Sequence, residues 1–242
     1  MGKIVHARWE NYLPGLKAGS VDMIITDPPH NKTKLSWDYE VDLKAMWAEF
    51  YRVVKEDGAI VICATQPFAS DVIVSSSRYF RYEIIWNKMK GTTPMLSRKR
   101  PMASHENVLV FYRKMPGYNV LYTPGTPYKA PKTGGGRTNK VTGATSDANN
   151  FVQQDNPGRR HLVSVWNFSM HCGSKRMPTE KPVELYERFI RMYTKKGDLV
   201  VDPMAGSGPL IDACKKTKRK YICVDKSKEQ CAMMRARRKG AE

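Results

Sequence analysis

The stretch VVDPMAGSGPLIDACKK, residues 200–216, has the pattern of a buried strand, a turn with two glycines and a helix. Gly206 and Gly208 let the backbone approach a ligand closely, and the start of the helix offers free N–H groups. Asp225 ends the next apolar run, 19 positions after Gly206, where an acid can bind a ribose diol. Ile211 stands where a dinucleotide motif has its third glycine, so a nucleoside without pyrophosphate fits this turn better. A plain strand-to-helix turn is the alternative interpretation.

Apolar strand-like runs alternate with helix-like runs on both sides of this turn. The alternation predicts an α/β fold with a central, mostly parallel sheet and helices on both faces. Strands are expected over residues 21–26, 59–65, 82–88, 107–114, 198–204 and 220–226, with a short one within 161–168. Helices are expected over residues 42–58, 66–77, 181–197, 209–218 and 227–240, with Pro182 in a first turn and Gly58 and Gly197 at helix ends.

The composition limits the class of protein. The 242 residues suit one α/β domain with an insertion, or one domain with a small subdomain. The formal charge of +18 favours a polyanionic partner, with nucleic acid as first candidate and an ordinary basic protein as the alternative. No apolar run has the length of a membrane span and no signal-peptide pattern is present, so no membrane partner is expected. Five cysteines without a C-x-x-C pair predict reduced, buried thiols, no metal site and an intracellular protein.

A second informative stretch, ITDPPHNK at residues 25–32, ends an expected strand with a carboxylate, two prolines and a ring. The prolines stiffen the backbone directly behind Asp27, which fixes the direction of its carboxylate. A rigid turn at a strand end is the alternative interpretation, because Asp-Pro turns are common.

Together these motifs resemble those of amino-directed DNA methyltransferases that use S-adenosylmethionine, in the permuted class whose catalytic motif precedes the cofactor motif. The family tetrapeptide D/N/S-P-P-Y/F/W corresponds here to Asp27, Pro28, Pro29 and His30. The family motif D-P-F-x-G-S-G-T corresponds to residues 202–209, and H-P-T-x-K-P corresponds to residues 177–182. The resemblance covers most of residues 5–115 and 161–240. It implies a Rossmann-like methyltransferase fold.

The resemblance also implies how the chain is divided. One methyltransferase domain would span residues 1–242, with a catalytic half over about 1–115 and a cofactor-binding half over about 178–242. A target-recognition insertion would occupy about 90–178, overlapping the end of the catalytic half. Residues from about 116 to 178 fit this, because they are rich in Gly, Pro, Thr, Asn and basic residues without a usable period.

The implied activity is methyl transfer to an exocyclic amino group of a flipped base, leaving S-adenosylhomocysteine. Asp27 and the carbonyl of Pro28 would accept the two N–H protons of the amine, Pro29 would stiffen the turn, and His30 would stack on the base. Asp at the first motif position favours adenine N6 over cytosine N4, as it does in the family. The residues implied at the cofactor are Asp202, Pro203, Met204, Gly206, Gly208 and Asp225, with Thr179 and Lys181 at its methionine end and Glu10 or Asn11 at its adenine.

Three positions depart from the family motifs. His30 replaces a larger ring, Met204 replaces Phe and Pro209 replaces Thr. A weakened enzyme or a catalytically silent DNA-binding relative is therefore an alternative, as is a cytosine-N4, RNA or protein amine methyltransferase. An NAD-linked oxidoreductase is disfavoured because the third glycine of the dinucleotide motif is missing.

Basic residues that are expected to contact the phosphates or bases of double-stranded DNA are Lys88, Lys90, Arg98, Lys99, Arg100, Arg137, Lys140, Arg159 and Arg160. A solvated, positively charged loop is the alternative. His105 and Glu106 begin an apolar strand and are expected to be structural. The resemblance is compatible with a homodimer and with a separate restriction nuclease, and it implies a cytoplasmic, nucleoid-associated protein of a bacterial or phage-infected cell.

Overall fold

The computed structural model describes residues 2–31, 38–129, 155–170 and 180–240. It divides into two compact units. The larger unit comprises Met1–Asn119 and Ser164–Glu242, and the smaller one comprises Val120–Val163.

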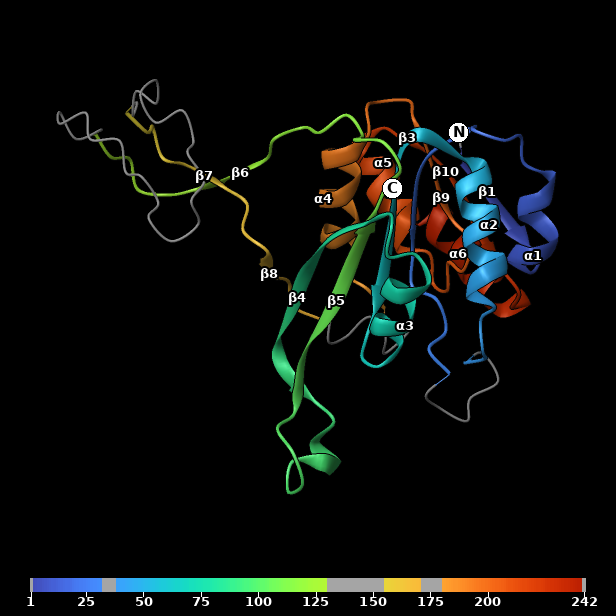
Figure 1. Cartoon of the computed structure of the whole chain (residues 1–242), viewed down its shortest axis with the longest axis horizontal. Coiled ribbons are helices and arrows are strands. Elements are labelled where there is room, and N and C mark those ends of the chain that lie inside the picture. The colour runs from blue at the N-terminus through green and yellow to red at the C-terminus, as the bar shows by residue number, and fades with distance from the viewer. Residues whose placement is uncertain (1, 32–37, 130–154, 171–179, 241–242) are drawn as a thin grey trace. The chain divides into compact units, whose positions relative to one another are not determined.

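The larger unit is built on an eight-stranded sheet with the order β1-β10-β9-β2-β3-β5-β4-β8 (Figure 1). The strands are β1 Gly2–His6, β2 Val21–Thr26, β3 Val54–Ala64, β4 Phe80–Thr92, β5 Ala103–Phe111, β8 Val165–Asn167, β9 Leu199–Asp202 and β10 Lys220–Asp225. Strand β5 runs antiparallel to β3 and β4, and the other neighbouring strands are parallel. The expected α/β fold with a mostly parallel sheet is confirmed.

Helices cover both faces of this sheet (Figure 1). They are α1 Trp9–Tyr12, α2 Leu43–Val53, α3 Phe68–Ser75, α4 Val183–Tyr193, α5 Pro209–Thr217 and α6 Lys228–Lys239, with short 3-10 turns η1 Leu13–Gly15 and η2 Pro94–Leu96. Phe50 of α2 and Val72 of α3 share one buried core with Ile24 and Ile60 of the sheet. Helices α4 and α5 pack on each other, and α4 touches β2 and β3 from the other face.

The expected helix over residues 42–58 is wrong over residues 54–58. Asp42 caps α2 by accepting a 3.0 Å hydrogen bond from the Ala45 N–H, but the helix ends at Val53. Strand β3 begins at once, because Val54 pairs with Val21 of β2. Gly58 is needed for close packing rather than for ending a helix, since an added Cβ would lie 2.8 Å from the carbonyl oxygen of Asp22. No strand was expected over β1, which joins the edge of the sheet beside β10.

The direction of the strands places the predicted site residues at one edge. The carboxyl ends of the parallel strands carry Asp27, Asp202 and Asp225, and ligands of open α/β sheets bind at such an edge. Strand β5 runs in the opposite direction, so its first residues lie at the same edge. Glu106 is among these residues.

The β4–β5 hairpin extends beyond the sheet, with η2 at its tip (Figure 1). The register shifts between Asn87 and Thr92, which marks a bulge where the hairpin leaves the sheet. Thr93 adopts a left-handed conformation with φ of 70° just before η2.

The smaller unit contains the antiparallel pair β6 Tyr122–Pro124 and β7 Arg159–His161, with a further bridge between Tyr128 and Asn156. The short strand expected within residues 161–168 is therefore divided, because His161 ends β7 while residues 165–167 form β8 of the larger unit. None of the described helices is long and apolar enough to cross a membrane.

Candidate active site

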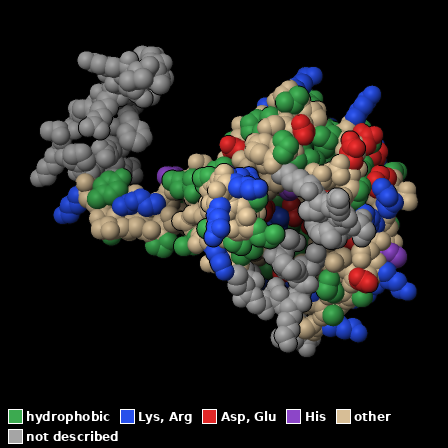
Figure 2. Space-filling view, turned by 90° about the horizontal axis from the view of Figure 1, so that it is seen from below, with side chains coloured by type: hydrophobic (Ala, Val, Ile, Leu, Met, Phe, Trp, Pro, Cys, Tyr) green, Lys and Arg blue, Asp and Glu red, His purple; other side chains and the backbone are tan. Residues whose placement is uncertain are grey.

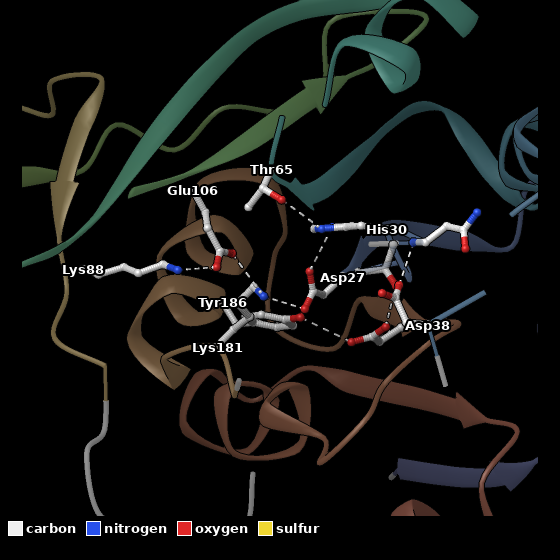
Figure 3. Close-up of polar contacts among 11 residues, drawn as sticks. Asp27, His30, Asp38, Thr65, Lys88, Glu106, Lys181 and Tyr186 are labelled. Carbon is white, nitrogen blue, oxygen red and sulfur yellow. Dashed lines mark hydrogen bonds and ion pairs between the residues drawn. The ribbon is translucent and has the colours of Figure 1, made fainter. Parts of the chain in front are cut away.

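Asp27 lies directly after β2 and forms an ion pair with Lys181, which precedes α4 (Figure 3). The Lys181 Nζ is 2.5 Å from Asp27 Oδ2 and 3.1 Å from Glu106 Oε2. The second oxygen of Glu106 lies 2.7 Å from the Nζ of Lys88. Segments that are far apart in the sequence thus meet in one row of alternating charges at the carboxyl edge of the sheet.

The two oxygens of Asp27 have different surroundings. Oδ2 accepts a hydrogen bond from Lys181, whereas Oδ1 is buried and has no hydrogen-bond partner among the described residues. The Nε2 atom of His30 is 3.8 Å from Oδ1, beyond hydrogen-bond distance. A buried acceptor without a donor is rare in folded proteins, and it commonly marks a functional position.

The ring of His30 is held from two sides. Its Nδ1 atom is 3.1 Å from the hydroxyl of Thr65, and its ring stacks on Phe68 with centroids 4.8 Å apart. Pro29, His30 and Phe68 also line a pocket of about 750 Å³, together with the carboxylates of Asp42 and Asp71. Figure 2 looks onto this edge of the sheet and shows it hollowed, with Lys and Arg side chains beside the hollow.

Asp202 connects the end of β2 to the glycine turn. It is 1% exposed, and its Oδ1 accepts hydrogen bonds from the Thr26 hydroxyl at 2.8 Å and from the Met204 N–H at 3.2 Å. Its Oδ2 is 3.5 Å from the hydroxyl of Tyr186. Burial raises the pKa of Asp202 to about 7, with the hydrogen bonds from Thr26 and Met204 acting against this.

The glycine turn is hydrogen-bonded to the end of β10. The Gly206 N–H donates to Asp225 Oδ2 at 2.9 Å, and the Ser227 N–H donates to Oδ1 of the same carboxylate at 2.8 Å. Burial raises the pKa of Asp225, against these backbone hydrogen bonds. Gly206 has φ of 52°, and an added Cβ would meet no atom of the described residues within 4 Å. The backbone thus turns beside open space, which fits a nucleoside cofactor held by this turn.

The remaining predicted cofactor residues lie in different places. Pro203 is buried and Met204 is half-buried against the core beside the turn. Asn11 is exposed on α1, and Glu10 forms an ion pair with Arg8. Thr179 lies outside the described residues. Contacts of any of these residues with a cofactor stay predictions.

The predicted DNA-contacting residues lie in different surroundings. Lys88 is half-buried in the ion pair with Glu106, whereas Lys90, Arg98, Lys99 and Arg100 are exposed on the β4–β5 hairpin. In the smaller unit, Arg159 lies over the ring of Tyr122 at 5.8 Å and Arg160 over the ring of Tyr128 at 5.0 Å. Arg137 and Lys140 fall outside the described residues. Exposed cations on a projecting hairpin suit contact with a phosphate backbone.

Within the described part of the chain, no group of three or more His, Cys, Asp or Glu side chains is arranged to hold a metal ion. Cys63, Cys214, Cys223 and Cys231 are free and buried. Burial raises the pKa of the thiol of Cys63 well above its ordinary value, so it stays protonated.

Comparison with known proteins agrees with this arrangement. The model of the N6/N4 methyltransferase family, described as DNA methylase, matches residues 21–236. The chain belongs to this DNA methylase family. The expected resemblance to amino-directed DNA methyltransferases is therefore confirmed.

Individual DNA methylases extend the match. The Type II methyltransferase M.HpaI of Haemophilus parainfluenzae is 30% identical over 252 aligned residues, which cover 93% of this chain and 70% of the relative. The DNA adenine methyltransferase YhdJ of Escherichia coli strain K12 is 25% identical over 95% of this chain and 80% of its own length. The crystal structure of an M1.HpyAVI–SAM complex matches 98% of this chain and all of its own, with a TM-score of 0.63 at 22% identity. This last likeness supports the fold.

The sequence pattern missed the place of Glu106 in the candidate site. It begins an apolar strand, and a strand start is a common place for a structural polar residue. Only the antiparallel direction of β5 brings it to the edge where Asp27 lies. Thr65 and Phe68, which hold the ring of His30, were missed for the same reason, because their role depends on a contact across more than thirty positions.

Proposed function

We propose that this DNA methylase transfers a methyl group from S-adenosylmethionine to the exocyclic amino group of a flipped base in double-stranded DNA, with adenine N6 as the acceptor. The observation that carries the proposal is the asymmetry of Asp27. Lys181 holds Oδ2, while the buried Oδ1 accepts nothing from the described residues. An unsatisfied buried acceptor costs about 1–3 kcal/mol, and the N–H of a base amine would satisfy it.

The chemistry follows from the electronic structure of the amine. Its lone pair is shared with the aromatic ring, so the nitrogen is a weak nucleophile. Asp27 Oδ1 and the carbonyl oxygen of Pro28 each accept a hydrogen bond from one N–H of the amine. These two hydrogen bonds localise the lone pair on the nitrogen. S-adenosylmethionine, when bound, supplies the methyl group from its sulfonium. Asp27 then accepts the proton that the nitrogen loses as its bond to carbon forms.

The glycine turn supports the choice of cofactor. Gly206 faces open space, and Asp225 fixes the backbone of the turn while each of its oxygens keeps a further lone pair for a ribose hydroxyl. Gly208 is the N-cap of α5, so the turn also lies at the amino end of this helix, whose first residue Pro209 has no N–H to offer. The M1.HpyAVI structure, which contains SAM, supports the same choice for this chain.

His30 and its pocket support a flipped base as the substrate. The pocket beside His30 has a volume of about 750 Å³, which is within the range of small-ligand sites. The ring of His30, backed by Phe68, offers an aromatic surface for the base. Asp at the first position of the tetrapeptide favours adenine, as does the name of the relative YhdJ. Cytosine N4 is the second candidate, because the family includes both kinds of enzyme.

The exposed cations of the β4–β5 hairpin and Arg159 of β7 support duplex DNA as the partner. Lys90, Arg98, Lys99 and Arg100 extend from the same edge of the sheet as Asp27. A separate restriction nuclease fits the Type II naming of M.HpaI. The chain would then protect the DNA that the nuclease cuts.

The test is transfer of labelled methyl from S-adenosylmethionine to unmethylated duplex DNA, with the modified nucleoside identified by mass spectrometry. Wild type is run beside Asp27→Ala, and single-stranded RNA competes with the duplex. We expect N6-methyladenine from wild type and a loss of label in Asp27→Ala. Detection of N4-methylcytosine would show that cytosine N4 is the acceptor. Label on RNA instead of on the duplex would show that the substrate is RNA. DNA binding without any label would favour a silent DNA-binding relative.

A further inference from the structure

Lys88, Glu106, Lys181 and Asp27 form a continuous row whose charges alternate in sign (Figure 3). The three contacts measure 2.7, 3.1 and 2.5 Å between nitrogen and oxygen. Glu106 is the one member that touches both lysines. The row has no net charge, so each buried charge in it has a partner of opposite sign.

The surroundings favour the ionised forms of Lys181 and Glu106. Burial lowers the pKa of Lys181, but Asp27 and Glu106 more than offset this and leave it raised. Burial likewise raises the pKa of Glu106, and Lys181 and Lys88 outweigh that effect and lower it. Lys181 is 6% exposed and Glu106 is 9% exposed, so solvent screens these charges only weakly.

Strand register explains why Glu106 reaches both lysines. Glu106 of β5 pairs with Trp86 of β4, and Lys88 lies two residues further along β4 on the same face. The Nζ of Lys88 lies 5.5 Å from the ring centre of Trp86, which holds the lysine stem over the sheet. Glu106 is therefore held by contacts within the sheet, whereas its partner Lys181 lies in a loop.

Lys181 needs this support because of where it lies in the chain. It lies between Glu180, which forms a 3.0 Å ion pair with Arg237 of α6, and Pro182, the N-cap of α4, so it belongs to no helix or strand. Asp27 also lies in a loop, after β2. Groups on strands hold a geometry more precisely than groups on loops, so Glu106 of β5 gives this ion pair between two loop residues a third partner on a rigid element.

We propose that Glu106 is a positioning residue for methyl transfer: it fixes Lys181 against Asp27 Oδ2, and this leaves Oδ1 directed at the base amine. Lys88 supports the arrangement by holding the second oxygen of Glu106. The inference rests on the proposed function, and it adds two residues that touch neither the base nor the cofactor.

The test is a comparison of Glu106→Gln with wild type in single-turnover methyl transfer at saturating DNA and cofactor. Gln keeps the shape of Glu but removes the charge that faces Lys181. Because a displacement of about 1 Å at a reacting group can cost about 10²-fold in rate, we expect a loss approaching that size. Dissociation constants for DNA and for S-adenosylmethionine should stay within about threefold of wild type, since Glu106 contacts neither.

Glu83→Gln is the matched control. Glu83 is a carboxylate on β4 that accepts a 2.7 Å hydrogen bond from the side chain of Asn107, the neighbour of Glu106 on β5. The same substitution there removes one charge from the same pair of strands without touching Lys181. It should leave the transfer rate within about twofold of wild type.

Lys88→Met is the second variant, and it serves if Glu106→Gln does not fold. It leaves both contacts of Lys181 in place and frees one oxygen of Glu106. We expect a smaller loss of rate in the same direction at saturating DNA, with an unchanged dissociation constant for S-adenosylmethionine. Melting curves of all variants report whether the fold is kept.

Three outcomes overturn the inference. One is a wild-type rate in both Glu106→Gln and Lys88→Met. Another is a loss of rate in Glu106→Gln that is matched by an equal loss of its affinity for DNA or for the cofactor. The third is an equal loss in Glu83→Gln, which would make the effect a general one of charge. Absence of methyl transfer in wild type would instead overturn the proposed function, and this inference with it.

Discussion

The hydroxyl of Thr26 donates a 2.8 Å hydrogen bond to Oδ1 of Asp202, across 176 positions of sequence. This buried contact joins the last residue of β2, just before the tetrapeptide that begins at Asp27, to the last residue of β9, just before the glycine turn. The tetrapeptide at Asp27 and the glycine turn are therefore held at a fixed separation by one side-chain contact as well as by strand pairing.

Asp202 gives the stability of the protein a specific dependence on pH. Burial raises its pKa to about 7 in the folded chain, whereas an unfolded Asp has an ordinary value of about 3.9. Between these values the folded chain binds a proton that the unfolded chain has released. The contribution to stability is therefore complete below about pH 4 and is lost as pH rises through about 7.

Asp202→Asn tests this dependence, because Asn keeps an oxygen that accepts from Thr26 and Met204. The free energy of unfolding, measured with urea from pH 4.5 to 8, should fall with rising pH more in wild type than in the variant. Parallel curves for the two proteins over this range would contradict the raised pKa.

Gly206→Ala and Gly208→Ala should have separable effects. Both glycines have positive φ, of 52° and 76°, so alanine costs about 1–2 kcal/mol at either position. At Gly208 the new Cβ would also lie 2.6 Å from Cγ of Met234, which adds strain. At Gly206 it would point into open space, where the cofactor is proposed to bind.

We therefore expect Gly208→Ala to lower the free energy of unfolding more than Gly206→Ala. Gly206→Ala should weaken binding of S-adenosylmethionine by more than its loss of stability explains. Urea unfolding and calorimetric titration measure the two quantities. Unchanged cofactor affinity in Gly206→Ala would remove this glycine from the proposed cofactor site.

The value of kcat/KM for DNA should depend on the size of the ring at position 30. Base–aromatic stacking contributes about 1–3 kcal/mol, so His30→Ala should lower kcat/KM for DNA by about 5- to 150-fold. His30→Tyr restores the larger ring of the family tetrapeptide and should match or exceed the wild-type value. A loss in His30→Tyr as large as in His30→Ala would mean that the imidazole acts through Thr65 or Asp27 rather than by stacking.

The β4–β5 hairpin should account for part of the salt dependence of DNA binding. Replacing Arg98, Lys99 and Arg100 by alanine removes three exposed cations. Each lost phosphate contact should reduce the slope of log K against log salt by about 0.9. Fluorescence anisotropy with a labelled duplex at several salt concentrations measures the slope, and cofactor affinity should not change.

A control with the same change of charge uses the opposite edge of the sheet. Lys195, Lys196 and Lys220 are exposed near the amino ends of β9 and β10. Their replacement by alanine should leave the slope closer to the wild-type value. Equal slopes for the two triple variants would mean that only net charge, and not the hairpin, attracts DNA.

Much of this protein could be predicted from short patterns in the sequence. The alternation of apolar strands and helices predicted the α/β fold, and the tetrapeptide at Asp27 and the turn at Gly206 predicted two site positions at strand ends. These patterns are local: a strand followed by a rigid turn looks the same wherever it lies. The sequence misjudged the boundary after Val53, because Val54 extends a strand only when β2 is beside it.

The tertiary structure alone decided which side chains meet. Lys181 was expected at the methionine end of a cofactor, and the structure pairs it with Asp27 across 154 positions. Glu106 was expected to be structural, and the antiparallel course of β5 brings it to the same edge. The sequence by itself determined the elements and the chemistry at their ends, because these depend on neighbouring residues. Charge pairing depends on strand order and direction, which arise only when the whole sheet is assembled.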